Sequence, residues 1–253
     1  MAVGRQAATV ITDSLRANPK AGVTFATGST PLETYNELAR LSCAGILDCS
    51  RATGFHLDEY VGLPNDHSET YQHYLQEHVF QHLHFGAVHF LNGCVGNLEE
   101  ECHRYDRLLQ TIGVDVLIAG IGANAHLAFN EPPADPDRTT HIEHLSEQTR
   151  RDNARFFGGR IDQVPQQAIT QGLRNILDAR QIVLLATGGG KAEAVRRAVE
   201  ESVTRACPAS FLQHHPNVTI ILDKAAAAKL TERTPHVEYL HLDTPVVASA
   251  TAS

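Results

Sequence analysis

The strongest candidates for catalytic residues follow an apolar stretch that ends in a glycine turn, Gly120-Ile121-Gly122. Asn124 and His126 come next, and Glu131 stands five residues after the histidine. Imidazole titrates near neutral pH, and a nearby carboxylate fixes its tautomer and raises its pKa. Most single histidines are structural, but one that lies between an asparagine and a glutamate at a strand end indicates acid–base catalysis.

Two adjacent carboxylates, Asp58 and Glu59, follow another predicted strand. Successive side chains of a strand point to opposite faces, so we expect only one of the two to face a pocket. A carboxylate in that position is a candidate general base. Taken alone, the pair also fits an ordinary surface turn, which is the simpler interpretation.

The segment Ala26–Glu33 predicts a site for an anion. Thr30 is a candidate helix N-cap, with Pro31 at the first helical position and Glu33 completing a capping box. The free amides of such a helix start, next to Gly28 and the hydroxyls of Thr27, Ser29 and Thr30, suit a phosphate group. The alternative is a well-capped helix that binds nothing.

Two cations could complete a phosphate site. Lys191 follows the glycine turn Thr187–Gly190, whose spacing is not that of a Walker A loop. Arg155 precedes two phenylalanines and could reach over a pocket to bind phosphate with two hydrogen bonds. A solvated lysine and a charged helix face are the alternatives.

Metal binding is not expected. His78 and His82 are spaced by four residues, but the glutamate of an HExxH zinc motif does not accompany them. We therefore predict no metal site and look for chemistry that side chains perform alone.

These residues need elements to position them, and short apolar runs alternate with amphipathic ones along the chain. The candidate strands are Val23–Thr27, Gly54–Asp58, Val88–Leu91, Val114–Gly120, Ile182–Thr187, Val218–Leu222 and Val237–Leu242. The candidate helices are Gly4–Ala17, Pro31–Ser42, Tyr71–Leu83, Leu98–Thr111, Ala168–Leu177 and Ala192–Val203. The alternation predicts a three-layer α/β/α fold with a mostly parallel, Rossmann-like central sheet.

The pattern predicts a single domain over residues 1–253, with a lid segment around residues 141–165 and a weakly structured tail after Asp243. In open α/β sheets, ligands bind beyond the carboxyl ends of the strands. The candidate residues above all follow such ends, so we expect them to meet at one edge of the sheet.

Composition limits the partners and the compartment. The net charge of −8 disfavours nucleic acid, and no stretch approaches the roughly 20 apolar residues that span a membrane. The five cysteines form no CxxC pair, which favours a reducing compartment over a disulfide framework. We expect a cytoplasmic protein with a small-molecule ligand.

Several motifs together resemble the glucosamine-6-phosphate deaminase family. The matches span the chain from about Ala21 to Asp223. The motifs LDEYVGLP and HLAFNEP are the most specific, because the related 6-phosphogluconolactonases have a different sequence in place of HLAFNEP. The matching segments are Ala26–Pro31, Leu57–Pro64, Gly120–Pro132, Asn153–Phe157, Val183–Lys191 and Pro208–Asp223.

The resemblance implies conversion of glucosamine 6-phosphate to fructose 6-phosphate and ammonia, without metal or organic cofactor. It implies that Asp58 moves the proton between C2 and C1, that His126 opens the sugar ring, and that Glu131 holds His126. It implies phosphate binding by six residues, Thr27, Gly28, Ser29, Thr30, Arg155 and Lys191. Arg155 would belong to a mobile lid that closes on the substrate.

Two positions depart from the family pattern. Asn124 stands where many members carry an aspartate of the histidine triad, so the pKa of His126 is expected to be less elevated. Ala125 replaces a usual glycine, and a positive φ there would cost on the order of 1 kcal/mol.

Other functions remain open at this point. The motifs do not report the configuration at C4, so galactosamine 6-phosphate is an alternative substrate. A non-catalytic sugar-phosphate sensor is another alternative, although Asp58 and His126 are both present. Self-association could range from monomer to hexamer.

Overall fold

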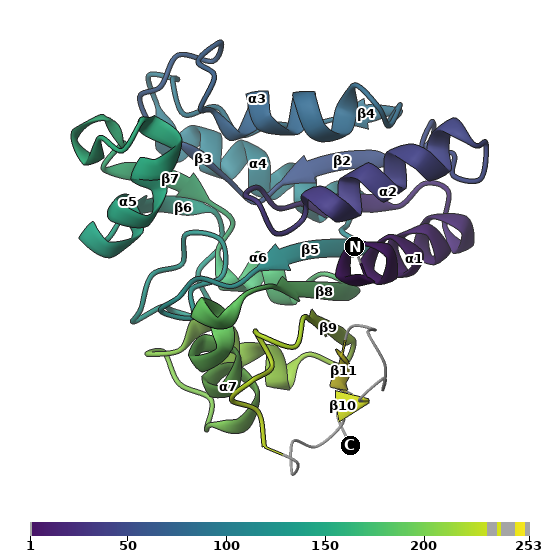
Figure 1. Ribbon diagram of the computed structural model, residues 1–253. Helices are drawn as coiled ribbons and strands as arrows, with labels where there is room; N and C mark the ends of the chain where they lie inside the picture. Colours follow the sequence, from purple (N-terminus) through teal and green to yellow (C-terminus); the bar gives the residue numbers. More distant parts are fainter. Residues whose placement is uncertain (1, 232–236, 239–245, 251–253) are drawn as a thin grey trace.

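A computed structural model describes residues 2–231, 237–238 and 246–250. Its centre is a twisted sheet with six parallel strands, in the spatial order β4–β2–β1–β5–β8–β9 (Figure 1). These strands are β1 (Gly22–Phe25), β2 (Thr53–His56), β4 (Ala87–Val88), β5 (Val116–Gly120), β8 (Gln181–Ala186) and β9 (Val218–Leu222). The prediction of a parallel α/β sheet is confirmed.

Helices cover both faces of this sheet, which explains why its strands are apolar almost throughout. On one face, α1 (Ala2–Ala17) packs along α2 (Leu32–Cys43), while α4 (Leu98–Ile112) and α6 (Leu173–Leu177) lie behind the sheet (Figure 1). Helix α7 (Ala192–Glu200) follows β8, and α3 (Tyr71–Leu75) continues as a π-helical segment over Gln76–Phe80. No helix in the described ranges is long and apolar enough to cross a membrane.

A second, three-stranded sheet lies at the carboxyl edge of the first. Its strands β3 (Asp58–Tyr60), β7 (Gln167–Thr170) and β6 (His141–His144) pair antiparallel in the order β3–β7–β6. The predicted strand Gly54–Asp58 is therefore wrong at its end, because the chain changes sheets at Leu57. The Leu57 amide still bonds to the Phe25 carbonyl of β1, whereas its own carbonyl accepts from Gln171.

The predicted helix Ala168–Leu177 is wrong over its first residues. Ala168 to Thr170 belong to β7, and the helix begins only at Leu173. Gly172 stands between them because a Cβ there would collide with the backbone carbonyl of Arg138. The two β-branched residues Ile169 and Thr170 suit the buried strand.

The carboxyl-terminal prediction also needs correction. Residues 246–250 form a strand, β11 (Val246–Ala250), antiparallel to the exposed edge of β9, where the sequence predicted weak structure. Of the predicted strand Val237–Leu242, only β10 (Val237–Glu238) is described, and it pairs with β11. Residues 239–242 lie outside the described part of the chain.

The segment 141–165 packs on a hydrophobic cluster of its own. After β6 it forms α5 (Glu147–Asn153) and two 3-10 turns, Ala154–Phe157 and Ile161–Gln163. Its side chains pack against β3 and β7 in a cluster of Tyr60, Phe129, Leu145, Ala154, Phe157, Val164 and Ala168. This second core is separate from the one between the large sheet and its helices. That the segment acts as a mobile lid stays a prediction.

Candidate active site

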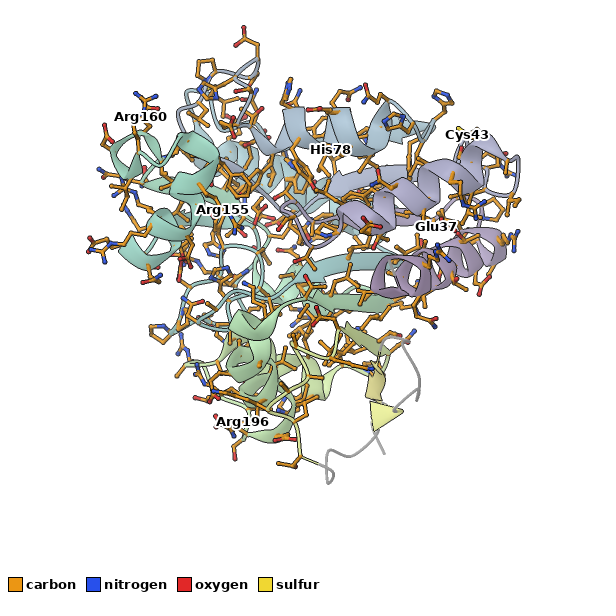
Figure 2. All side chains as sticks on the ribbon, viewed as in Figure 1. Glu37, Cys43, His78, Arg155, Arg160 and Arg196 are labelled. Atoms are coloured by element: carbon orange, nitrogen blue, oxygen red, sulfur yellow. The ribbon has the colours of Figure 1, made fainter. Side chains whose placement is uncertain are left out.

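The carboxyl ends of β1, β5 and β8, together with β3, surround a cavity of about 730 Å³. Segment 141–165 and α3 close it from two sides, and Figure 2 shows Arg155 on the first of these. Predicted site residues that line it are Thr27, Gly28, Ser29, Thr30, Asp58, His126, Arg155 and Lys191. Asn124 and Glu131 are not among its lining residues; both bond in the turn around His126.

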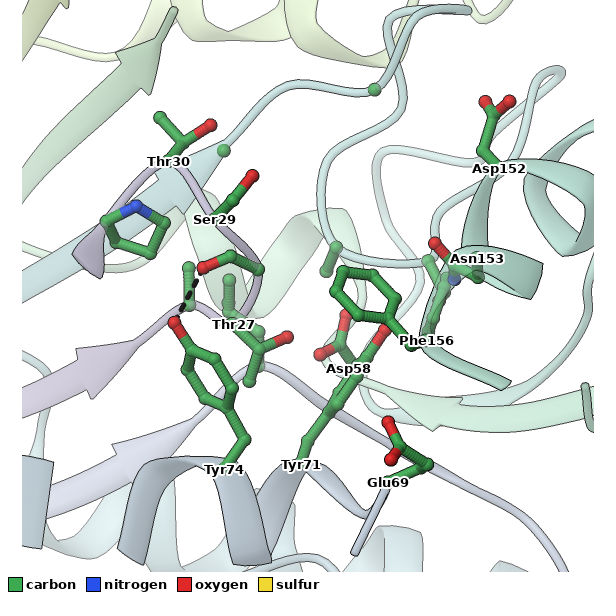
Figure 3. A pocket seen from close by; sticks show the side chains of 18 of the residues that line it. Thr27, Ser29, Thr30, Asp58, Glu69, Tyr71, Tyr74, Asp152, Asn153 and Phe156 are labelled. Atoms are coloured by element: carbon green, nitrogen blue, oxygen red, sulfur yellow. Dashed lines mark hydrogen bonds between the residues drawn. The ribbon is translucent and has the colours of Figure 1, made fainter. Parts of the chain in front are cut away.

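The Thr27–Thr30 turn forms one end of the cavity (Figure 3). Gly28 has a φ of 97°, which L side chains rarely adopt. Its carbonyl accepts a 2.6 Å hydrogen bond from the Tyr74 hydroxyl, which holds the turn against α3. The turn leads directly into α2, as the anion-site prediction requires.

The predicted capping box at this helix is wrong. Pro31 is the N-cap of α2, with a φ of −81° and ψ of −7°, and no side chain caps the helix. This right-handed helical conformation of Pro31 moves the cap one residue beyond Thr30. The helix start therefore has amides without a side-chain cap, which favours binding of an external anion.

Two cations and one carboxylate that interact electrostatically also line the cavity. Lys191 ends the turn before α7, and burial lowers its pKa below the ordinary value. Arg155 has its guanidinium 4.7 Å from the centre of the Phe156 ring. Asp152, which the sequence analysis did not single out, also lines the cavity, and its charge raises the pKa of Lys191 while that of Arg155 lowers it.

Asp58 begins β3 and is nearly buried at 6% exposure. Burial, and then the charge of Glu59, raise its pKa well above the ordinary carboxyl range. The carboxylate is thus a stronger base than a solvated aspartate. Figure 3 shows it facing the cavity beside Tyr71.

The neighbouring carboxylate of Glu59 points elsewhere, which confirms that only one of the pair faces the pocket. It accepts hydrogen bonds from the backbone amides of Tyr60, Tyr71 and Gln72, at 2.8 to 3.0 Å. Burial nevertheless raises its pKa to about 7. Glu59 thereby ties β3 to the first turn of α3.

His126 reaches the cavity from the turn after β5. Gly122 lets the ring pack against the backbone, because a Cβ at that position would collide with the imidazole. Ala125 has a φ of 70°, so the conformational strain expected from the sequence is present. Its amide bonds to Gly122 and its carbonyl accepts from Ala209, so the turn is held from both sides.

The interaction predicted between Glu131 and His126 is indirect. Their nearest atoms, His126 Nδ1 and Glu131 Oε2, are 3.9 Å apart, and Nδ1 has no hydrogen-bond partner in the described part of the chain. Asn124 connects the two instead. Its amide donates to Glu131 Oε2 at 2.8 Å, and its carbonyl accepts from the His126 backbone at 3.2 Å.

The pKa of His126 lies below the ordinary value, whereas the sequence predicted a raised one. Burial is the largest cause; the charge of Glu131 acts in the opposite direction but does not outweigh it. The other oxygen of Glu131 accepts from the hydroxyls of Ser146 and Thr149 at the start of α5. The imidazole is therefore neutral near pH 7, and able to accept a proton.

Tyrosines that the sequence analysis did not single out complete the wall next to Asp58. Tyr60 and Tyr71 line the cavity, and the Tyr71 hydroxyl donates to that of Tyr60 at 3.2 Å. Asn153 also donates to the Tyr60 hydroxyl, at 2.9 Å. The alternation of strand side chains was the available signal, because Tyr60 stands two residues after Asp58.

One cavity thus contains a candidate base, a neutral imidazole and a predicted anion site. The first two groups can transfer protons, and the third suits a small ligand that carries a phosphate. The described residues contain no group of three or more histidine, cysteine or acidic side chains that could hold a metal ion. The parallel sheet and this cavity at its carboxyl edge are the arrangement of an α/β enzyme with acid–base groups.

A family model described as glucosamine-6-phosphate isomerases/6-phosphogluconolactonase matches residues 1–221, and the chain belongs to this family. It is 47% identical over 230 residues to the glucosamine-6-phosphate deaminase of Streptomyces avermitilis, over 90% of this chain and 88% of that protein. It is 44% identical over 225 residues to glucosamine-6-phosphate deaminase 2 of Giardia intestinalis, over 88% and 86%.

Solved structures agree with the assignment. A monomeric glucosamine-6-phosphate deaminase has a TM-score of 0.87 and 39% identity, over 90% of this chain and 95% of that chain. A 6-phosphogluconolactonase from Trypanosoma brucei shares the fold, with a TM-score of 0.74 and 20% identity over 90% and 95%.

Proposed function

We propose that this enzyme converts glucosamine 6-phosphate and water into fructose 6-phosphate and ammonia, with the residues around the cavity in the roles that follow. The observation that carries the proposal is the position of Asp58, a nearly buried carboxylate of raised pKa, in the same cavity as His126 and two cations. The identity to deaminases over most of the chain supports the same reaction.

The phosphate end of the cavity positions the substrate. The amides and hydroxyls of Thr27–Thr30 bind the phosphate oxygens, and Lys191 and Arg155 neutralise their charge. Binding one end of a six-carbon chain places the carbons at the other end against Asp58, which lowers the entropic part of the barrier.

Proton transfer follows from the two titratable groups. His126, neutral and facing the cavity, takes the proton of the anomeric hydroxyl and returns a proton to the ring oxygen, which opens the ring. Asp58 takes the proton from C2 and delivers it to C1, while the aldehyde oxygen gains a proton and the amine nitrogen gives one up, so that the aldehyde becomes a hydroxymethyl group and C2 becomes an imine. Water adds at C2, and ammonia leaves.

Ammonia release from glucosamine 6-phosphate tests this proposal, with galactosamine 6-phosphate in parallel and Asp58→Asn as the comparison. We expect release from the gluco sugar and a loss of at least about 10²-fold in the variant, the usual contribution of a general base. Release from the galacto sugar alone would replace the substrate. No release from either sugar, with phosphate binding intact, would make the chain a sensor.

The proposal also covers the cellular compartment, the partner and the oligomeric state. All five cysteines are free, as a reducing compartment such as the cytoplasm requires. The partner is a small sugar phosphate. We propose a monomer, as the solved relative of 39% identity is described to be.

A further inference from the structure

The short segment that carries Arg155 is attached to one residue of the small sheet. Asn153 and Phe157 flank Arg155 at two residues on either side, and both contact Tyr60. The Asn153 amide donates to the Tyr60 hydroxyl at 2.9 Å. The Phe157 ring meets the Tyr60 ring edge-on, with centroids 5.7 Å apart.

Tyr60 is itself firmly held. Its side chain is 1% exposed, and its backbone pairs with Ala168 of β7. The Tyr71 hydroxyl supplies a second hydrogen bond at 3.2 Å. Tyr60 stands two residues after Asp58 on the same strand, so both side chains point to the same face of the sheet.

Arg155 has no comparable support of its own. It is exposed; in the described part of the chain its guanidinium lies over the Phe156 ring, and it is near enough to Lys191 for the two like charges to repel. The backbone around Arg155 is a 3-10 turn, closed by hydrogen bonds from the Gly158 and Gly159 amides to the Ala154 carbonyl. The place of Arg155 therefore depends on where this turn docks, and Asn153 and Phe157 attach it to Tyr60.

We propose that Tyr60 is a positioning residue that sets the place of Arg155 relative to Asp58, and that affinity for the phosphate group depends on its hydroxyl. The inference rests on the proposed function, because it uses the phosphate role of Arg155. When an anchor is lost, the segment that carries Arg155 gains conformational freedom. Binding of phosphate by the guanidinium must then restrict that freedom, and the entropy cost lowers the affinity. Tyr60 acts through Arg155 and has no separate chemical role.

Tyr60→Phe separates the two anchors. The phenylalanine ring keeps the contacts with Phe157, Tyr71 and Phe129, while the hydrogen bonds from Asn153 and from the Tyr71 hydroxyl are lost. Asn153→Leu removes only the bond between Asn153 and Tyr60, from the other side. If the bond is what matters, the double variant is no weaker than either single one.

Calorimetric titration of the full chain with inorganic phosphate is the test. We expect Tyr60→Phe, Asn153→Leu and the double variant each to weaken binding about fivefold, the range of one hydrogen bond. Glu147→Gln on the same helix is the control, because its exposed pair with Arg151 is worth little, and it should stay within about twofold. With glucosamine 6-phosphate, the expected effect of Tyr60→Phe is on KM, with kcat within about twofold.

Three results would overturn the inference. The first is unchanged phosphate affinity in Tyr60→Phe, the second is additive losses in the double variant, and the third is an Arg155→Ala variant that binds phosphate like the parent. A purely structural role would instead lower kcat and the thermal midpoint together. An enzyme that passes the phosphate test but releases no ammonia would refute the proposed function and leave this inference standing.

Discussion

The turn around His126 shows how one amide changes the chemistry of its neighbours. Asn124 donates to Glu131 Oε2 at 2.8 Å, so the carboxylate has a neutral partner on that side. An aspartate in the same place would add a second negative charge beside Glu131 and near the imidazole. Asparagine thus gives Glu131 a neutral hydrogen-bond partner beside an imidazole whose pKa burial has lowered.

Asn124→Asp is predicted to move the acid limb of the pH–rate profile. A second negative charge near the ring raises the pKa of His126, and His126 must be neutral to accept a proton, so activity is lost at a higher pH as the solution is acidified. We expect kcat/KM to show this limb up to about one pH unit higher. A limb that stays in place, or moves to lower pH, would show that this position does not act on the charge of His126.

Asp58, His126 and Lys191 all line the cavity, and they could be predicted because each stands in the short stretch that follows a parallel strand. The residues that were missed enter the cavity by a different route. Asn153 and Asp152 reach it because segment 141–165 docks on Tyr60, and this depends on packing between residues far apart in the chain. Local periodicity carries no information about such docking.

The smaller elements of the fold were also the harder ones to predict. Leu57 separates two sheets without a glycine or proline to mark the change, and the apolar pattern continues across it. The sequence pattern of β7 was assigned to a helix because the strand is only four residues long and α6 begins directly after Gly172. The six parallel strands were recognisable because burial on both faces leaves continuous apolar runs.

At the start of α5, one hydroxyl serves both the helix and the site. Ser146 Oγ accepts from the Thr149 amide as N-cap, and it also lies 3.1 Å from Glu131 Oε1. The first turn of α5 is therefore fixed to the turn that carries His126. This contact joins the segment 141–165 to the loop after β5 at a second place, away from Tyr60.

Ser146→Ala is compared with Asn97→Ala, which removes the cap of α4 from an exposed position away from the cavity. Each variant should lose about 1 kcal/mol of unfolding free energy, the usual value of an N-cap. Only Ser146→Ala should also lower kcat/KM, because it removes one of the hydrogen bonds to Glu131 together with the cap of α5. Urea unfolding and steady-state kinetics give both quantities. Equal kinetics in the two variants would show that this cap is structural alone.

In the whole molecule, the candidate catalytic residues lie at the carboxyl edge of the large sheet, and buried residues behind that edge stabilise the fold. His56, the last residue of β2, illustrates the second part because it lies two residues before Asp58 and never reaches the cavity. It is fully buried, and its Nε2 accepts from the Leu91 amide at 2.7 Å, so its proton is on Nδ1. Burial, and then the charge of Arg104, lower its pKa to about 3.

This pKa predicts how the stability of the whole chain responds to acid. The unfolded chain binds a proton at His56 near pH 6.5, whereas the folded chain does so only near pH 3, so unfolding takes up a proton between these values. Stability is lost as the pH falls through this window, by about 1.4 kcal/mol per unit from this group. Between pH 6.5 and 5 the loss amounts to about 2 kcal/mol.

His56→Gln removes this dependence and supplies the test, with His103→Gln at an exposed position as its match. The variant at His56 is less stable near neutral pH, because the Leu91 amide no longer has the imidazole Nε2 as its hydrogen-bond acceptor. Its loss of unfolding free energy between pH 6.5 and 5 should nevertheless be smaller by about 2 kcal/mol. Burial raises the pKa values of Asp58 and Glu59, which act in the opposite direction. They are common to all three proteins, so they cancel in the comparison. An equal drop in the parent and in both variants, measured by urea unfolding, would mean that His56 takes no part in acid unfolding.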